Sequence, residues 1–219
     1  MKLHSDSFPN KGVIPPEFAF AQMDEKTRVK LSSNKSPHFS WTDVPEHTQS
    51  FVMLCIDATA PTDPKDVNQT DREVPAELPR TDFSHWVLIN IPAETREFQV
   101  GQFSHEVTPK GKAGPVVAGL KASSMRQGIN DYTHWFAGDH DMEGDYYGYD
   151  GPCPPWNDSL VHSYTFTLYA LDVAELTLPA DGKLNLASVT RRMQEHVLAS
   201  ASWNGVYTLT PRLAVALAI

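Results

Sequence analysis

The chain has 219 residues, of which 41% are hydrophobic and 21% charged, with a net charge of −9 and a sequence pI of about 5.4. The acidic balance argues against nucleic acid as a partner, because the phosphate backbone of a nucleic acid is bound mainly by Lys and Arg. The same negative charge would repel the protein from an anionic membrane surface. The composition is that of an ordinary globular protein. We therefore expect a single domain over residues 1–219, in which residues 213–219 are a candidate tail.

The sequence carries no sign of a membrane or secretory segment. No run of apolar residues reaches the length of about 18 that a spanning helix needs, so we expect no integral membrane segment. The opening MKLHSDSFPN lacks the apolar core of a signal peptide. Two cysteines, Cys55 and Cys153, are too few for a disulfide framework, and we expect both to be reduced. These features together predict a cytoplasmic location.

Short apolar runs between prolines predict a β-rich chain. Residues 50–57, SFVMLCID, are nearly all apolar, which is typical of a short strand buried on both faces. Residues 83–91 and 161–171 are rich in β-branched and aromatic side chains, and a last strand is expected near residues 202–210.

The alternation of side chains along a strand predicts which residues share a face. It places His162 on the same face as Tyr164, and His85 on the same face as Phe83 and Val87. Two histidines from different strands are therefore candidates for a common site.

One helix is expected close to the C-terminus. Asn185 can cap its start, and an apolar stripe follows at helical spacing, formed by Leu186, Val189, Met193 and Val197. Two polar, irregular stretches, residues 61–79 and 125–156, are expected to be long loops. Long loops within a compact domain are often functional.

Several short motifs carry a resemblance to a known family when they are taken in chain order. The blocks are FPNKGVIP from Phe8, NKSPHFSW from Asn34, DATAP from Asp57, SHW from Ser84, YDGPCPP from Tyr149, HSYTFTLYALD from His162 and EHVLASASWNGVY from Glu195. Together they span nearly the whole chain. The sequence resembles the phosphatidylethanolamine-binding protein family, especially its bacterial Raf-kinase-inhibitor-like branch.

This resemblance implies a mainly β fold, namely a Greek-key antiparallel β-sandwich with one or two peripheral helices. It also implies a pocket at one end of the sandwich that binds phosphate-type anions, including phospholipid head groups, without a cofactor. Relatives in this branch tend to be dimers, so a homodimer is expected. The residues that the resemblance assigns to the pocket are Asp57, Thr59, His85, Trp86, Gly151, Pro152, His162 and Tyr164.

The first pocket block departs from the family pattern. The family usually has Asp-Pro-Asp-Ala-Pro there, and this chain has DATAP, so Thr59 stands where a second carboxylate is usual. The change removes a negative charge from the expected pocket. We therefore expect a phosphate to be repelled less and an ammonium group to lose a partner. The loop before YDGPCPP is also long, and we expect it to narrow or reshape the mouth of the pocket.

The residue types suit the binding of an anion. Imidazoles donate hydrogen bonds, and they donate from both nitrogens when protonated, so binding is expected to weaken as the pH rises. Asp57 is expected to accept a hydrogen bond from a histidine, Tyr164 to donate its hydroxyl, and Gly151 to expose backbone N–H groups. The plainer interpretation is that His85, His162 and Tyr164 are core residues with satisfied hydrogen bonds and that Asp57 caps a turn.

Two further features stay open between a functional and an ordinary role. The thiol of Cys153 adjoins the expected pocket, although nothing in the sequence activates it. The acidic stretch before it has the spacing of an EF-hand calcium loop, but with Asp at the last position and no helical flanks, which favours a solvated loop over a metal site. Its candidate ligands are Asp139, Asp141, Glu143, Asp145 and Asp150.

The function expected from these features is that of a small-molecule binding module for phosphate or phospholipid head groups, with regulation of a partner protein as an extension. A hydrolase-type enzyme that uses the histidine pair is the first alternative. It is disfavoured because the sequence has neither a G-x-S-x-G elbow nor an H-E-x-x-H motif. An inhibitor of a kinase or a protease is the second alternative.

Overall fold

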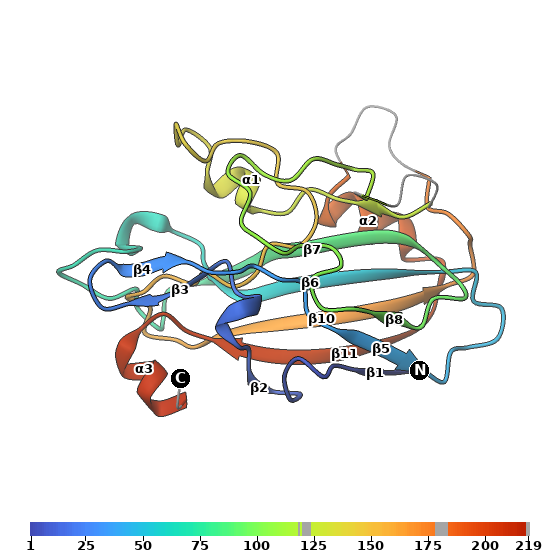
Figure 1. Ribbon diagram of the computed structural model, residues 1–219, viewed down its shortest axis with the longest axis horizontal. Coiled ribbons are helices and arrows are strands. Elements are labelled where there is room, and N and C mark those ends of the chain that lie inside the picture. The colour runs from blue at the N-terminus through green and yellow to red at the C-terminus, as the bar shows by residue number, and fades with distance from the viewer. Residues whose placement is uncertain (118, 120–123, 178–183, 218–219) are drawn as a thin grey trace.

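Two sheets packed face to face form the body of this computed structural model, which describes residues 1–117, 119, 124–177 and 184–217 (Figure 1). The larger sheet has the strand order β2-β11-β10-β6-β7-β9, and the smaller has the order β1-β5-β8. The strands of the larger sheet are β2 (Gly12–Val13), β11 (Val197–Tyr207), β10 (His162–Leu171), β6 (Ser50–Pro61), β7 (Arg80–Pro92) and β9 (Arg126–Gln127). Those of the smaller sheet are β1 (Lys2–His4), β5 (Phe39–Thr42) and β8 (Glu97–Phe98).

The remaining elements are short. A separate hairpin pairs β3 (Ala21–Asp24) with β4 (Arg28–Leu31), and the 3-10 turns are η1 (Pro16–Phe18) and η2 (Pro64–Asp66). The described residues contain three α-helices, which are α1 (Tyr132–Trp135), α2 (Leu186–Met193) and α3 (Pro211–Leu217). The predicted antiparallel sandwich is confirmed, with one more helix than expected and with a parallel pairing of β2 and β11.

The central strands of the larger sheet, β6 and β7, are buried on both faces over most of their length. One face packs against the smaller sheet, and aromatic side chains such as Trp41, Phe51 and Phe166 fill the space between them. On the other face Val52 and Leu54 of β6 contact a second apolar cluster. This arrangement explains why β6 reads as an almost continuous apolar run rather than as an alternating one.

Helix α2 covers the second face of the larger sheet, beside β7 (Figure 1). Asn185 caps its start as predicted, because its side chain accepts a hydrogen bond from the Ser188 N–H at 3.0 Å. Val189 and Met193 are buried against the sheet. The predicted stripe ends there, since Val197 already belongs to β11, which begins five residues earlier than expected.

A β-bulge in β7 changes which side chains share a face. Cys55 pairs with Trp86, and the next residue of β6, Ile56, pairs with Ser84, so His85 is the extra residue. Because of this bulge, Trp86 joins the core between the two sheets while Val87 lies in the cluster on the other face. The predicted common face of His85 and Val87 is therefore wrong, although His85 and Phe83 do lie together.

The ends of the chain and its two long loops complete the fold. Most of the candidate tail, residues 213–219, is the end of α3, with Ala214 buried and residues 218–219 outside the described part. The expected loop at 61–79 includes η2, and the loop at 125–156 includes β9 and α1. Within the described residues, no helix has the length and apolar character to cross a bilayer.

Candidate functional site

A small cavity lies at one end of the larger sheet. The chain leaves β6 at the end of the sheet where it enters β7 and β10, because both of these strands run antiparallel to β6. The cavity has a volume of about 120 Å³ and is walled mostly by apolar and aromatic side chains. It is lined by Asp57, Ala60, Pro61, Val67, Asn68, Thr81, Phe83, His85, Tyr132, Trp135, Cys153, Pro154, Pro155, His162 and Tyr164.

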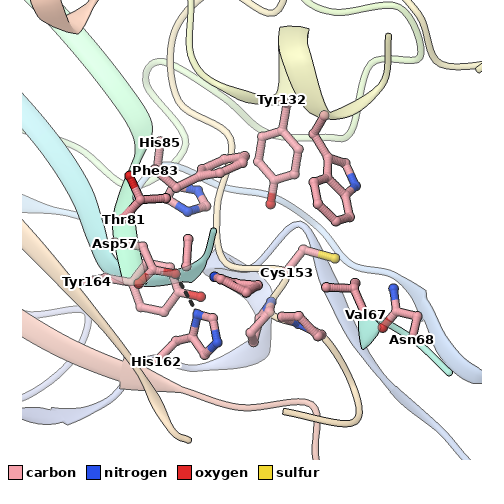
Figure 2. Close-up of a pocket in the computed structure, with 15 residues that line it drawn as sticks. Asp57, Val67, Asn68, Thr81, Phe83, His85, Tyr132, Cys153, His162 and Tyr164 are labelled. Carbon is pink, nitrogen blue, oxygen red and sulfur yellow. Dashed lines mark hydrogen bonds and ion pairs between the residues drawn. The ribbon is translucent and has the colours of Figure 1, made fainter. Parts of the chain in front are cut away.

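A short polar contact between two lining residues joins two strands. Nδ1 of His162 lies 2.6 Å from Oδ2 of Asp57, and both side chains are almost completely buried (Figure 2). Register explains the approach, because Asp57 is paired across the sheet with Tyr164, two residues after His162. The expected hydrogen bond between Asp57 and a histidine is therefore present, and it is formed with His162.

The second nitrogen of His162 is also engaged. Its Nε2 lies 3.0 Å from Oδ2 of Asp158, a carboxylate that the sequence analysis did not single out. Burial alone would lower the pKa of His162, but the hydrogen bonds with Asp158 and Asp57 outweigh it and raise this pKa to about 9. Both N–H groups of the imidazolium are then taken by carboxylates. His162 therefore has no free donor for a ligand, contrary to the expectation that both histidines donate to an anion.

The two carboxylates stay ionised for the same reason. Burial alone would raise the pKa of Asp57, but the hydrogen bond and charge of His162 hold it below its usual value. For Asp158 burial is likewise outweighed by hydrogen bonds from His162 and Arg80, and its pKa falls to about 2. Asp57 and His162 thus form a neutral ion pair in the cavity wall, and Asp158 with Arg80 forms a second pair behind it.

His85 differs from His162 in its charge and in its free nitrogen. Burial lowers its pKa below the usual histidine value, although the charge of Asp57 acts in the opposite direction. Its Nδ1 donates to the carbonyl oxygen of Asp150 at 2.8 Å, which fixes the tautomer. Nε2 makes no hydrogen bond to any described residue. A neutral His85 therefore presents an acceptor to the cavity, and a protonated one presents a donor.

Tyr164 brings a hydroxyl group that has no partner. Its side chain is 1% exposed, and its hydroxyl oxygen makes no hydrogen bond with any part of the chain that the structure describes. The ring packs edge-on against His85, with 5.1 Å between the ring centroids. Figure 2 shows the hydroxyl pointing into the space between His162 and Cys153. An unsatisfied buried hydroxyl is costly, which makes this group a candidate for ligand binding.

Thr59 and Trp86 lie outside the cavity, contrary to their place in the predicted pocket. The Thr59 hydroxyl donates to Oδ1 of Asp57, and the Thr59 N–H donates to the same oxygen at 2.7 Å, so this residue orients Asp57. Trp86 is turned into the core by the bulge, and its Nε1 donates to Gln127 at 3.1 Å. Neither residue reaches the cavity lining.

Gly151 and Pro152 also support the site from outside. The Gly151 N–H donates to Oδ1 of Asn34 at 2.8 Å, so the expected free backbone donor is already used. The carbonyl oxygen of Pro152 accepts from the N–H groups of Phe20 and Ala21. A Cβ atom at Gly151 would lie only 2.0 Å from the Phe18 carbonyl oxygen, which explains why glycine stands there. These contacts fix the segment that brings the following Cys153 to the cavity.

The two cysteines are free, as predicted. Cys153 lines the cavity, and burial raises the pKa of its thiol to about 12. At neutral pH the thiol is therefore protonated, and the thiolate is the nucleophilic form. Cys153 acts here as an apolar wall residue.

The candidate calcium ligands of the acidic stretch are not gathered in one place in the described structure. Asp150 is completely buried and accepts hydrogen bonds from Lys112 at 2.6 Å and from Asn34 and Asn130 at 2.8 Å. Asp139 instead accepts from the backbone N–H groups of Asp141 and Met142 in an exposed turn. Among the described residues no group of three or more acidic, His or Cys side chains is arranged to hold a metal ion.

Several residues that line the cavity were not predicted from the sequence to belong to the site. Phe83 and Tyr132 form an aromatic wall with 5.2 Å between their ring centroids, and Trp135 stands at the mouth with 45% of its surface exposed. Tyr132 and Trp135 come from α1, inside the expected long loop, so the loop forms part of the cavity. Asp158 precedes His162 by four residues, a spacing that is informative only once the turn between them is known.

Comparisons with known proteins agree with this architecture. A sequence model described as phosphatidylethanolamine-binding protein matches residues 4–208. A UPF0098 protein of Aquifex aeolicus is 32% identical over 94% of this chain and 88% of its own length. The UPF0098 protein YbhB of Escherichia coli is 30% identical over 95% of this chain and all of its own. The crystal structure of E. coli YbcL, described as a member of the mammalian PEBP family, superposes with a TM-score of 0.63 at 24% identity, covering 94% and 97% of the two chains.

Proposed function

Because the chain belongs to the phosphatidylethanolamine-binding protein family, a family of ligand-binding modules, we propose that it binds a small molecule through a phosphate-type group held in the cavity. The proposal places the oxygen atoms of this group against the Tyr164 hydroxyl and Nε2 of His85. The remainder of the ligand extends past Trp135 toward solvent.

The unpartnered hydroxyl of Tyr164 carries the proposal. It is a buried donor without an acceptor among the described residues, and it faces a cavity rather than packed side chains. An anionic oxygen is a strong acceptor, and a hydrogen bond to a charged group is worth about 1.5–3 kcal/mol. A ligand oxygen at this place would satisfy a buried hydroxyl of the cavity wall that has no partner among the described residues.

The charges of the wall support an anion as well. Asp57 would repel a phosphate if it stood alone, but His162 is 2.6 Å away and cancels its charge. His85 is neutral at ordinary pH because burial lowers its pKa. It can accept a hydrogen bond from a protonated phosphate oxygen, or it can take up a proton on binding and donate to a fully ionised one. Binding of a fully ionised phosphate is therefore expected to strengthen as the pH falls.

The volume and the lining limit the part of a ligand that enters. A cavity of about 120 Å³ holds a group of only a few non-hydrogen atoms, such as a phosphoryl group. Phe83, Tyr132 and Trp135 provide an apolar path from it to the surface. A phospholipid would therefore place only its head group here.

Calorimetric titration with inorganic phosphate and with O-phosphoethanolamine at about pH 6 and 8 tests the proposal. Wild type should bind both ligands, more tightly at the lower pH. Tyr164→Phe should weaken binding by about tenfold or more, and His85→Ala should reduce the pH dependence of binding to the part that the ligand's own ionisation causes. His134→Ala is the matched control, because His134 is an exposed histidine outside the cavity. Absence of phosphate binding to wild type at both pH values would contradict the proposal.

An enzyme that uses the histidine pair is less well supported by the geometry. Both nitrogens of His162 are held by carboxylates, and the raised pKa of Cys153 leaves the cavity thiol protonated. His85 alone would then serve as a base, with no serine in the cavity lining to activate. Turnover of nitrophenyl phosphate or acetate that is lost in His85→Ala would favour this second function.

Four further expectations stay predictions. They are regulation of a partner protein, inhibition of a kinase or protease, a homodimer and a cytoplasmic location. Light scattering of the purified chain tests the homodimer. Retention of a protein partner by wild type but not by Tyr164→Phe would connect such a partner to the cavity.

A further inference from the structure

His162 is held between two carboxylates in a geometry that needs two protons on its ring. Nδ1 lies 2.6 Å from Asp57 and Nε2 lies 3.0 Å from Asp158. Ionised carboxylates only accept hydrogen bonds, and a neutral imidazole has one N–H group. A neutral His162 would therefore leave a lone pair facing a carboxylate oxygen in a buried place. The contacts favour the imidazolium on grounds of geometry alone.

Asp158 is fixed from behind by Arg80. Nη1 of Arg80 donates to Oδ2 of Asp158 at 2.7 Å, and Nη2 donates to Oδ1 at 3.0 Å. The same guanidinium also donates to the carbonyl oxygens of Thr59 and Pro75, which ties it to β6 and to the segment between β6 and β7. Neither Asp158 nor Arg80 lines the cavity. Any effect that they have on a ligand must act through His162.

The charges around His162 show what Asp158 changes. On the cavity side, His162 contacts Asp57, and the same wall holds the neutral side chains of His85, Tyr164 and Cys153. On the side away from the cavity, His162 contacts Asp158, which is paired with Arg80. With His162 protonated, Asp57 is neutralised and the cavity wall has no net charge. If His162 lost its Nε2 proton, it would keep the bond to Asp57 but leave that carboxylate uncompensated.

We infer that Asp158, held by Arg80, is the residue that sets the charge preference of the cavity: it keeps both N–H groups on His162, which cancels the charge of Asp57 and allows an anion rather than a cation to bind. This inference rests on the proposed function for its anion. The state of His162 is a separate property that can be measured without any ligand. Asp158 is thus a positioning residue that does not touch the bound molecule.

Asp158→Asn removes the charge and keeps the shape. The amide has no negative charge, so it stabilises the second proton of His162 less than the carboxylate does. The signals of the imidazole nitrogens, followed by NMR from about pH 6 to 10, should show His162 deprotonating at a lower pH in the variant than in wild type. At about pH 8 the affinity for inorganic phosphate should fall by about tenfold, and at about pH 6 it should return to within about twofold of wild type.

Asp71→Asn is the matched control. Asp71 also accepts two hydrogen bonds from an arginine, at 3.0 and 2.9 Å from Arg72, but both side chains are exposed, and neither forms a hydrogen bond or ion pair with His162 or Asp158 in the described structure. This variant should leave both the His162 titration and the phosphate affinity unchanged. Ethanolamine provides the cationic probe, and its binding should be detectable only with Asp158→Asn at the higher pH.

The results separate the inference from the proposed function. If wild type binds no phosphate but His162 is protonated at about pH 8 in wild type and loses the proton at a lower pH in Asp158→Asn, the proposed function fails and the assigned role of Asp158 in holding the proton stands. If phosphate binds and Asp158→Asn changes neither the titration nor the affinity at that pH, the inference alone is overturned. Should the variant not fold, a neutral imidazole spectrum for His162 in wild type at about pH 7.5 would overturn the inference as well.

Discussion

His85 and Asp150 are joined by two hydrogen bonds, one from Nδ1 of the ring to the Asp150 carbonyl oxygen at 2.8 Å and one from the Asp150 N–H to the His85 carbonyl oxygen at 3.0 Å. This contact ties the strand β7 to the segment that leads to Cys153. It also decides which nitrogen of His85 faces the cavity. The acidic residue that completed an apparent calcium loop in the sequence is in fact the anchor of the histidine.

Replacement of Tyr164 by phenylalanine should leave the fold intact. The hydroxyl has no hydrogen-bond partner among the described residues, so its removal should change the free energy of unfolding by less than about 0.5 kcal/mol or raise it slightly. Tyr207→Phe is the comparison, because its hydroxyl donates to Ala21 at 2.9 Å and its loss should cost about 1 kcal/mol. Urea unfolding measures both. A cost at Tyr164 equal to that at Tyr207 would show that the hydroxyl is satisfied.

The free energy of unfolding should fall as the pH rises from about 6.5 to 9. The pKa of His162 is raised to about 9 by Asp158 and Asp57 despite its burial, so the folded state holds this proton more tightly than the unfolded chain does. The resulting stabilisation is complete below the ordinary histidine pKa and is lost through about pH 9. His85 acts in the opposite direction below pH 6.5, because burial lowers its pKa.

Urea unfolding at about pH 6.5, 7.5 and 9 checks this dependence. His162→Gln should flatten the curve over this range. His196→Gln is the control, since His196 pairs with Asp172 at 2.9 Å but both side chains are partly exposed. A wild-type curve that stays level up to about pH 9 would contradict the assigned charge of His162.

Gly151→Ala should destabilise the protein strongly. The added methyl group would lie 2.0 Å from the Phe18 carbonyl oxygen, which is backbone and cannot move aside without disturbing the contacts of the neighbouring segment. A loss of about 3 kcal/mol is expected in urea unfolding. Gly138→Ala separates this clash from backbone strain, because Gly138 has a φ of +83° but open space around it. This variant should lower the free energy of unfolding by about 1 kcal/mol. Equal costs at the two glycines would contradict the steric argument.

Trp135→Ala should change ligand preference without changing the fold. Its side chain is 45% exposed at the mouth of the cavity, so truncation should alter the free energy of unfolding by less than about 1 kcal/mol. Phosphate should bind as before, because it needs only the inner cavity. The affinity for a phosphate ester with an apolar substituent, such as phenyl phosphate, should fall about fivefold in calorimetric titration. A parallel loss for both ligands would place Trp135 in contact with the phosphate itself.

Strand patterns and the family resemblance predicted the fold because the signals are local. The apolar run of β6 and the alternation of His162 and Tyr164 along β10 each follow from a few neighbouring residues, and both are confirmed. Helix α2 was predicted in the same way, from a cap and a stripe. Its predicted stripe ran too far because Val197 keeps the helical spacing but pairs in β11.

The details of the cavity depend on contacts between distant segments, which no local pattern contains. A single-residue bulge turns Trp86 into the core and His85 toward the cavity, and strand alternation cannot foresee it. Asp158 and Arg80 are separated by 78 residues, so their pairing and its effect on His162 emerge only from the folded chain. The Gly151 N–H was expected to be free, and Asn34 takes it from 117 residues away.

The most direct test of the binding site is the response of the two buried histidines to phosphate. The imidazole nitrogens of the intact protein would be followed by NMR at about pH 6.5 while inorganic phosphate is added. We predict that Nε2 of His85 shifts in a saturable way, while His162 stays protonated and nearly unchanged because both of its nitrogens are already held. A response at His162 with none at His85, or no response at either, would contradict the account.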